Sequence, residues 1–145
     1  MAKSAKSYRD LIVWQLGFRL RLHIVQMTKK CPRTTDRDFL WDIRRSARSV
    51  PSNTAEGHAR FNPPDNHRFL VIAKASLAET ENHLDAGLAD GDFSEEDYNV
   101  AKTLIKRLTP AIARLMAYLR TEEAKKNAAR IAATDYRTRR TKTNP

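Results

Sequence analysis

Residues 41–57 read W-D-I-R-R-S-A-R-S-V-P-S-N-T-A-E-G, and this stretch carries most of the information about the fold. At the helical spacing of about 100° per residue, the apolar positions in and just before it share one side, and basic positions share another. The apolar side consists of Phe39, Ile43, Ala47, Val50 and Thr54. The pattern therefore predicts an amphipathic helix over residues 36–56 that packs one side inward.

Pro51 lies inside this predicted helix. It lacks a backbone N–H and crowds the carbonyl of Ala47, so we expect a kink or a break there. Ser49 and Asn53 flank the proline with side chains that can bond backbone groups freed by it. Gly57 predicts an end to the helix in a left-handed C-cap.

Three further amphipathic segments are predicted as helices, over residues 11–30, 63–89 and 94–121. Asp10, Asn62 and Ser94 stand at their starts as N-caps, and Pro63 suits a first helical position. Four such helices with short turns predict an all-α protein, an antiparallel up-down four-helix bundle over residues 11–121. Residues 1–10 are expected to be a flexible N-terminus, and residues 122–145 a basic tail, partly helical or disordered.

The first predicted helix carries two apolar stripes where one core face needs only one. One stripe contains Val13, Leu16, Leu20, Ile24 and Met27, and the other contains Leu11, Trp14, Phe18, Leu22 and Val25. Either the core face is wide, or the second stripe packs against a neighbouring subunit.

The chain carries a net charge of +10 over 145 residues, which points to polyanionic partners. Residues 1–60 hold 13 Lys or Arg against 5 acids, residues 61–121 hold 7 against 9, and residues 122–145 hold 7 against 3. The positive charge therefore lies in the first half of the chain and in the tail. No Lys or Arg occurs between Lys74 and Lys102, so one end of the second helical hairpin is acidic.

The basic side of the helix over residues 36–56 is the candidate nucleic-acid site. Arg37, Arg44 and Arg48 share it with Trp41. Arginine forks suit phosphates, and an exposed tryptophan can stack an unpaired base. The other predicted nucleic-acid-binding residues are Lys29, Lys30 and Arg33 at the end of the first helix, and Arg137, Arg139 and Arg140 in the tail. The competing interpretation is an ordinary solvated surface.

A polar row lies between the apolar and basic sides of the same helix. It contains Arg45, Ser49, Asn53 and Glu56, and it is expected to face Ser76, Glu79 and His83 of the third helix. A functional site is one interpretation. We favour the other, a structural polar network that fixes helix register around Pro51, because buried charges must be paired and hydrogen-bonded.

No catalytic chemistry is predicted. The common phosphate, dinucleotide, zinc and hydrolase motifs are absent, and Cys31 has no histidine placed by the sequence to activate it. Glu79 and His83 lie four residues apart, whereas di-iron bundles use a spacing of three. We therefore expect no enzyme activity, metal or cofactor. The chain has neither a membrane-spanning run nor a secretory signal, so a cytoplasmic protein is expected.

The motif I-R-R-S-A-R-S-V-P-S-N-T-A-E-G-x-x-R carries a family resemblance, with Y-R-D-L-I-V-W-Q before it and R-F-L-V-I-A-K-A-S-L-A-E-T-E after it. It resembles the bacterial four-helix-bundle family of 23S rRNA intervening-sequence proteins, over about residues 8–120. Asp42, Arg48, Thr54 and Ala75 depart from the family's usual residues. The accessory variability protein of diversity-generating retroelements is a relative of that family.

The resemblance implies a non-enzymatic accessory protein that binds RNA or an RNA/DNA hybrid with little sequence preference, RNA rather than DNA. By analogy with the retroelement relative, it implies a homo-oligomer such as a pentameric ring and a reverse transcriptase as partner. The alternative is an oligomeric scaffold that binds a protein partner. Phosphate binding weakens steeply with salt and apolar docking does not, so ionic strength separates the two.

Overall fold

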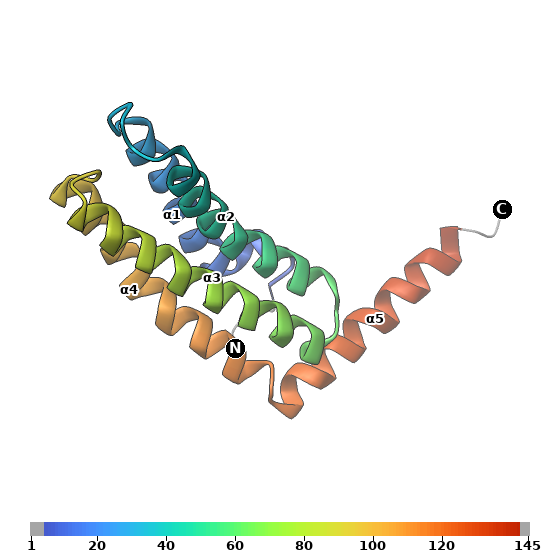
Figure 1. Ribbon diagram of the computed structural model, residues 1–145. Coiled ribbons are helices and arrows are strands. Elements are labelled where there is room, and N and C mark those ends of the chain that lie inside the picture. The colour runs from blue at the N-terminus through green and yellow to red at the C-terminus, as the bar shows by residue number, and fades with distance from the viewer. Residues whose placement is uncertain (1–4, 143–145) are drawn as a thin grey trace.

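The computed structural model describes residues 5–142, and over that range its regular structure is entirely helical (Figure 1). The α-helices are α1 (Ile12–Lys29), α2 (Arg37–Ala59), α3 (Pro63–Ala89), α4 (Glu95–Tyr118) and α5 (Glu122–Lys142), preceded by a short 3-10 helix, η1 (Tyr8–Asp10). The predicted all-α class is confirmed. Residues 1–4 and 143–145, the outer ends of the predicted flexible N-terminus and basic tail, lie outside the described residues.

Helices α1 to α4 lie side by side, and α1 and α3 each contact both α2 and α4 (Figure 1). The first stripe of α1 is buried along its whole length, as are Ile43, Ala47, Val50 and Thr54 on α2. Leu70, Leu77 and Leu84 of α3 and Leu104 and Leu108 of α4 complete the same core. Each such leucine or isoleucine contributes about 1.5–3 kcal/mol by leaving water. The sides of α1 and α2 that face the core are therefore the ones that the apolar periodicity predicts.

The second stripe of α1 lies at the edge of the core. Trp14 and Phe18 are partly buried and stack on each other, with ring centroids 4.9 Å apart. Leu22 remains 45% exposed. No helix in the described part of the chain carries an apolar stretch long enough to cross a bilayer.

The predicted N-caps Asn62 and Ser94 stand directly before α3 and α4, whereas Asp10 does not take that place before α1. The side chain of Asp36 accepts from the backbone N–H groups of Asp38 and Phe39, and Ser94 accepts from the N–H of Asp97. Asp10, expected as the N-cap of the first helix, instead accepts from the N–H of Ser7 and belongs to η1. The residue before α1 is Leu11, whose side chain makes no capping hydrogen bond.

Pro51 does not break α2, which runs through it from Arg37 to Ala59. The proline is buried against α1, where a Cβ added to Gly17 would lie 3.5 Å from the Pro51 Cδ and 3.1 Å from the Val50 Cγ1. The missing side chain at Gly17 lets the backbone of α1 approach α2 at this point. Packing of the proline ring thus offsets the loss of one helical hydrogen bond.

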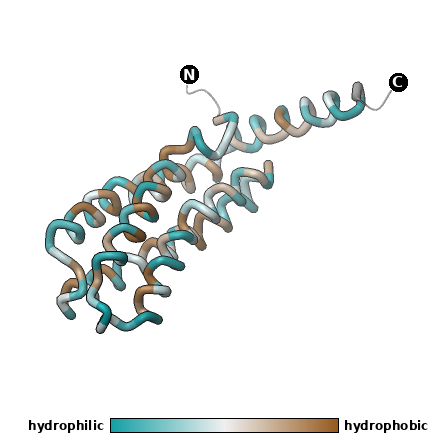
Figure 2. Tube along the Cα trace, turned by 90° about the horizontal axis from the view of Figure 1, so that it is seen from above, coloured by the Kyte–Doolittle hydropathy of each residue, from teal (hydrophilic) through white to brown (hydrophobic). Residues whose placement is uncertain are grey.

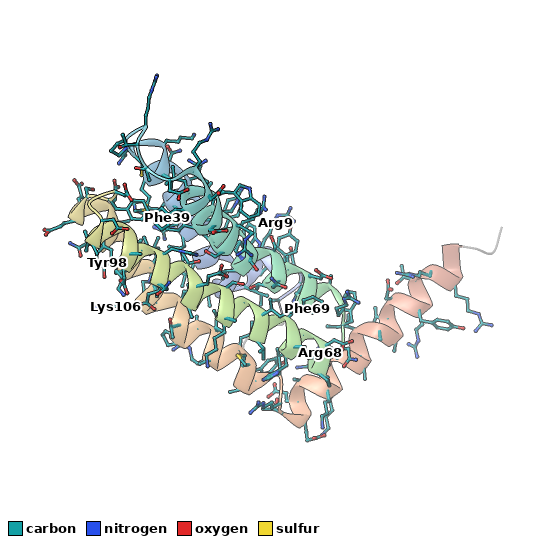
Figure 3. All side chains as sticks on the ribbon, in the orientation of Figure 1. Arg9, Phe39, Arg68, Phe69, Tyr98 and Lys106 are labelled. Carbon is teal, nitrogen blue, oxygen red and sulfur yellow. The ribbon has the colours of Figure 1, made fainter. Side chains whose placement is uncertain are left out.

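The prediction that Gly57 forms a left-handed C-cap is wrong. The helix continues past it to Ala59, and the positive φ, of 53°, belongs to Phe61 in the turn that follows. Gly57 serves a different purpose, since an added Cβ would lie 2.9 Å from the Phe69 Cβ and 2.7 Å from the Asn66 Oδ1. Phe69 lies near this turn (Figure 3). The glycine is therefore required for close contact between α2 and α3.

Helix α5 extends away from the other four, as two views at right angles agree (Figures 1 and 2). Ala124 is buried near its start, and residues 132–140 are exposed throughout. The helix carries few large apolar side chains that could be buried, which fits the exposure of its second half.

Replacing Gly57 with alanine is expected to destabilise the protein. Overpacking against Phe69 and Asn66 should lower the free energy of unfolding by about 1–3 kcal/mol. Helix propensity alone predicts the opposite sign, a gain of about 1 kcal/mol. Denaturant unfolding of both proteins, followed by circular dichroism, gives the sign of the change in the free energy of unfolding. A variant more stable than the wild type would contradict the close contact.

Candidate nucleic-acid interface

The N-terminal half of α2 presents a basic surface around one exposed tryptophan. We call Arg37, Trp41, Arg44 and Arg48 the Trp41 surface. Trp41 is 59% exposed, the largest exposed fraction among the large apolar side chains of α1 to α4. Arg37 and Arg48 are exposed as well, and Arg44 is half-buried. The structure therefore leaves an aromatic ring and several guanidinium groups accessible on one side of a helix whose other side is in the core.

The Trp41 surface includes a shallow hollow. It is lined by Arg37, Asp38, Leu40, Trp41 and Arg44. The guanidinium carbon of Arg45 lies 5.7 Å from the centroid of the Trp41 ring, which is within cation–π distance. Asp38 places one negative charge among these cations. The hollow is thus mostly cationic and aromatic, with one carboxylate that opposes the binding of anions.

Arg44 is held by a buried hydroxyl group. Its Nε donates to the Thr28 Oγ1 over 2.7 Å, and Thr28, near the end of α1, is only 3% exposed. Thr28 was not singled out in the sequence. Its spacing of four residues from Ile24 places it on the core side of α1, and that signal alone could have found it.

The cations at the α1–α2 end of the molecule differ in their pairing. Lys30 Nζ lies 3.0 Å from the Asp97 Oδ2, whereas Lys29 and Arg33 are exposed. Burial disfavours the charged form of Asp97, but the hydrogen bond and charge of Lys30 outweigh it and lower the pKa of this carboxyl. That pair is consequently formed at neutral pH, and it loses its contribution to stability only as the pH falls through the lowered pKa.

Asp92 of the α3–α4 turn also contacts the α1–α2 loop of the same chain. The Thr35 hydroxyl donates to the Asp92 Oδ1 over 2.7 Å, and the Cys31 thiol lies 3.4 Å from the Asp92 carbonyl oxygen. Burial and the nearby Asp92 raise the pKa of the Cys31 thiol. The thiol form is favoured at neutral pH, so this cysteine is a poor nucleophile.

The three predicted arginines of the tail are not brought to the Trp41 surface. Arg137, Arg139 and Arg140 lie on α5, which leaves the molecule at the end opposite the α1–α2 loop (Figure 1). Arg139 is 3.1 Å from Asp135 on the same helix. The predicted nucleic-acid-binding residues therefore form two separate regions.

The polar row divides into a buried part and an exposed part. In the buried part, the Ser49 and Ser76 hydroxyls are 2.8 Å apart, and the Thr80 Oγ1 lies 2.9 Å from the Ser46 Oγ. Asn53 Nδ2 donates to the Ser49 carbonyl over 2.8 Å. The hydroxyl pairs connect α2 and α3 through neutral groups, and they include Ser46 and Thr80, which the sequence pattern did not place in the polar row.

The exposed part contains the charges. Arg45 lies 2.6 Å from the Glu79 carboxylate and 3.8 Å from that of Asp42. His83 is 3.7 Å from Glu79, and its ring meets the edge of Phe39, labelled in Figure 3. Glu56 lies apart from this group because its carboxylate pairs with Arg60, 2.8 Å away on the same helix. No group of three or more His, Cys, Asp or Glu among the described residues is arranged to hold a metal ion.

Over the described residues, fold and surface together define a small, basic, helical protein in which arginines lie around one exposed tryptophan. The family model of the 23S rRNA-intervening sequence protein family matches residues 9–114. The chain belongs to that family. Helix α5 lies beyond the matched residues.

The fold is similar to that of a solved protein of unknown function from the S23 ribosomal protein family of Bacteroides thetaiotaomicron. The TM-score is 0.65 at 20% sequence identity, over 76% of this chain and 100% of the other. At that identity the likeness concerns the fold alone. A comparison with curated proteins returned no match.

Asn53→Ala and Glu56→Ala are expected to differ in stability. Removing the Asn53 amide breaks hydrogen bonds beside the α2–α3 contact and should cost about 1 kcal/mol. Glu56→Ala removes an exposed pair within one helix and should cost less than about 0.5 kcal/mol. Thermal melts of both variants measure the difference, and equal stabilities would count against a structural role for Asn53.

Proposed function

We propose that this protein binds nucleic acid, RNA in preference to DNA, through the Trp41 surface, with little sequence preference and without catalysis. The observation that carries the proposal is the exposed Trp41 ring set among Arg37, Arg44 and Arg48 beside a shallow hollow. Base stacking on an aromatic side chain contributes about 1–3 kcal/mol per base and tolerates any sequence. Guanidinium groups on either side supply contacts to phosphates.

The charge of the region supports the same assignment. Residues 29–48 contain seven Lys or Arg against three Asp. Lys30 and Arg45 have carboxylate partners, whereas no carboxylate lies within ion-pair distance of Arg37, Arg44 or Arg48 in the described part of the chain. Cations without such partners attract a polyanion at the least desolvation cost.

The proposal takes α1 to α4 as an antiparallel up-down four-helix bundle in a homo-oligomer, with a reverse transcriptase as a further partner. The bundle rests on the four amphipathic segments and their short turns, and the oligomer and the reverse transcriptase rest on the family resemblance. The partly exposed second stripe of α1, with Leu22 at 45% exposure, favours a second candidate function, an oligomeric scaffold that docks a protein. Binding to apolar surface depends weakly on salt, so one titration distinguishes the two functions.

The first test is fluorescence anisotropy of labelled single-stranded RNA, duplex RNA and single-stranded DNA at two salt concentrations. We expect the Arg37/Arg44/Arg48→Ala variant to bind single-stranded RNA at least about tenfold more weakly. The slope of its log affinity against log salt concentration should be smaller in magnitude by about 2, since each of the three lost phosphate contacts to a single strand contributes about 0.7 to that slope.

The matched control is Lys106/Arg107/Arg114→Ala, which removes the same charge from exposed positions of α4 (Figure 3 labels Lys106). We expect its affinity to stay within about threefold of the wild type, the loss of general attraction alone. Equal losses in the two triple variants would show that net charge, not the Trp41 surface, binds the RNA. No binding by the wild type at low salt would leave the scaffold function ahead.

Asp38→Asn is expected to strengthen RNA binding. Asp38 lines the hollow, and removing its negative charge takes away repulsion of a phosphate worth about threefold in affinity at low salt. Asp65→Asn is the control, because Asp65 likewise stands in the first turn of a helix, on α3. An equal gain in both variants, measured by the same anisotropy titration, would contradict a specific role for the hollow.

A further inference from the structure

Arg44 differs from the other positively charged residues near α2 in the group that holds it. Arg45, Arg60 and Lys30 are held by carboxylates, which neutralise their charge. Arg44 is held by the Thr28 hydroxyl, a neutral acceptor, through a 2.7 Å hydrogen bond to its Nε. Its position is restricted while its positive charge is kept, and that combination suits an anion-binding group.

The hydrogen bonds of Thr28 explain why its oxygen faces Arg44. The hydroxyl hydrogen is donated to the Ile24 carbonyl over 2.7 Å within α1. The oxygen then retains only acceptor capacity, which the Nε–H of Arg44 uses. Because Thr28 is 3% exposed, water does not compete effectively for this contact. A side chain in the core thus orients a guanidinium at the surface.

The remaining N–H groups of Arg44 are the two Nη amino groups. Neither donates to another described residue, and Arg44 lines the hollow together with Trp41 and Arg37. The Nη pair forms the end of the fork that grips two oxygens of one phosphate. An unpaired base resting on the exposed ring of Trp41 would place its phosphate beside this fork.

We propose that Arg44 forms a phosphate subsite next to Trp41, oriented by Thr28, and that the two together take one unpaired nucleotide. Thr28 is a positioning residue that acts through Arg44. The inference rests on the proposed function in that it names the part of the strand bound at the Trp41 surface. The phosphate group can belong to the backbone of a strand or to a free nucleotide, since both present the same oxygens.

The test compares Thr28→Val, Thr28→Ser and Arg44→Lys with the wild type in titrations of labelled single-stranded RNA. Thr28→Val keeps the shape of the side chain and removes the acceptor, so we expect binding about three- to tenfold weaker. The salt dependence should be unchanged, because Arg44 still meets the phosphate as a point charge. Thr28→Ser restores the hydroxyl and should return the affinity to within about twofold of the wild type.

Arg44→Lys keeps the charge but removes the fork. It should weaken RNA binding as much as Thr28→Val does and leave the salt dependence unchanged. Arg44→Ala removes the charge as well, so it should reduce the magnitude of the slope of log affinity against log salt concentration by about 0.7. This variant leaves Thr28 in place and keeps the test decisive if Thr28→Val fails to fold. Wild-type affinity in Arg44→Lys, or in folded Thr28→Val, would overturn the subsite, and so would a Thr28→Ser variant as weak as Thr28→Val.

Parallel titrations with adenosine 5′-monophosphate and inorganic phosphate identify the source of the phosphate. Binding of RNA that depends on Thr28 supports a strand, and binding of the nucleotide alone that depends on Thr28 supports a free nucleotide at the same subsite. If the wild type binds RNA, and the Arg37/Arg44/Arg48→Ala variant binds it more weakly while Thr28→Val and Arg44→Lys do not, the subsite is removed and the proposed function stands. Failure of the wild type to bind any of these probes removes both.

Discussion

Neutral hydrogen bonds between α2 and α3 fix the register in which the two helices pack. Hydroxyl groups of Ser46 and Ser49 on α2 lie within 3 Å of those of Thr80 and Ser76 on α3. Buried hydroxyls are costly unless they are paired, and they pair only at short range, so they permit one register of the two helices. Gly57 strengthens the same constraint, since only a residue without a side chain fits against Phe69 at that distance.

The outer side of α2 follows from that constraint. With Ser46, Val50 and Thr54 turned inward, Trp41 and Arg48 must face solvent, because they lie on the other side of the same helix. The arginines of α2 then differ in the groups that their side chains contact. Arg45 lies over the α3 contact and meets Glu79, while Arg44 reaches back toward α1 and finds a hydroxyl instead of a carboxylate. The availability of charge at the surface is therefore decided by which neighbouring helix each side chain meets.

The two basic regions of the chain differ in how they are supported. The Trp41 surface is built on a helix packed between α1 and α3, within the residues that match the family. Helix α5 carries its arginines on a segment that extends beyond those residues and is exposed over residues 132–140. A rigid surface can hold a nucleotide in a defined position, whereas exposed arginines on a projecting helix chiefly add general attraction for a polyanion.

The sequence by itself determined the helical class, the apolar sides of α1 and α2, the N-cap positions Asn62 and Ser94 and the family, because each depends on local periodicity or a contiguous motif. It misjudged Gly57, did not single out Thr28 and did not predict the hydrogen bond between Thr80 and Ser46. The reasons are physical: the need for glycine at residue 57 comes from a residue twelve positions later, and the partner of Thr28 lies on another helix. Which of the arginines keeps its charge free and its orientation fixed depends on contacts between helices, and only the tertiary structure decided it.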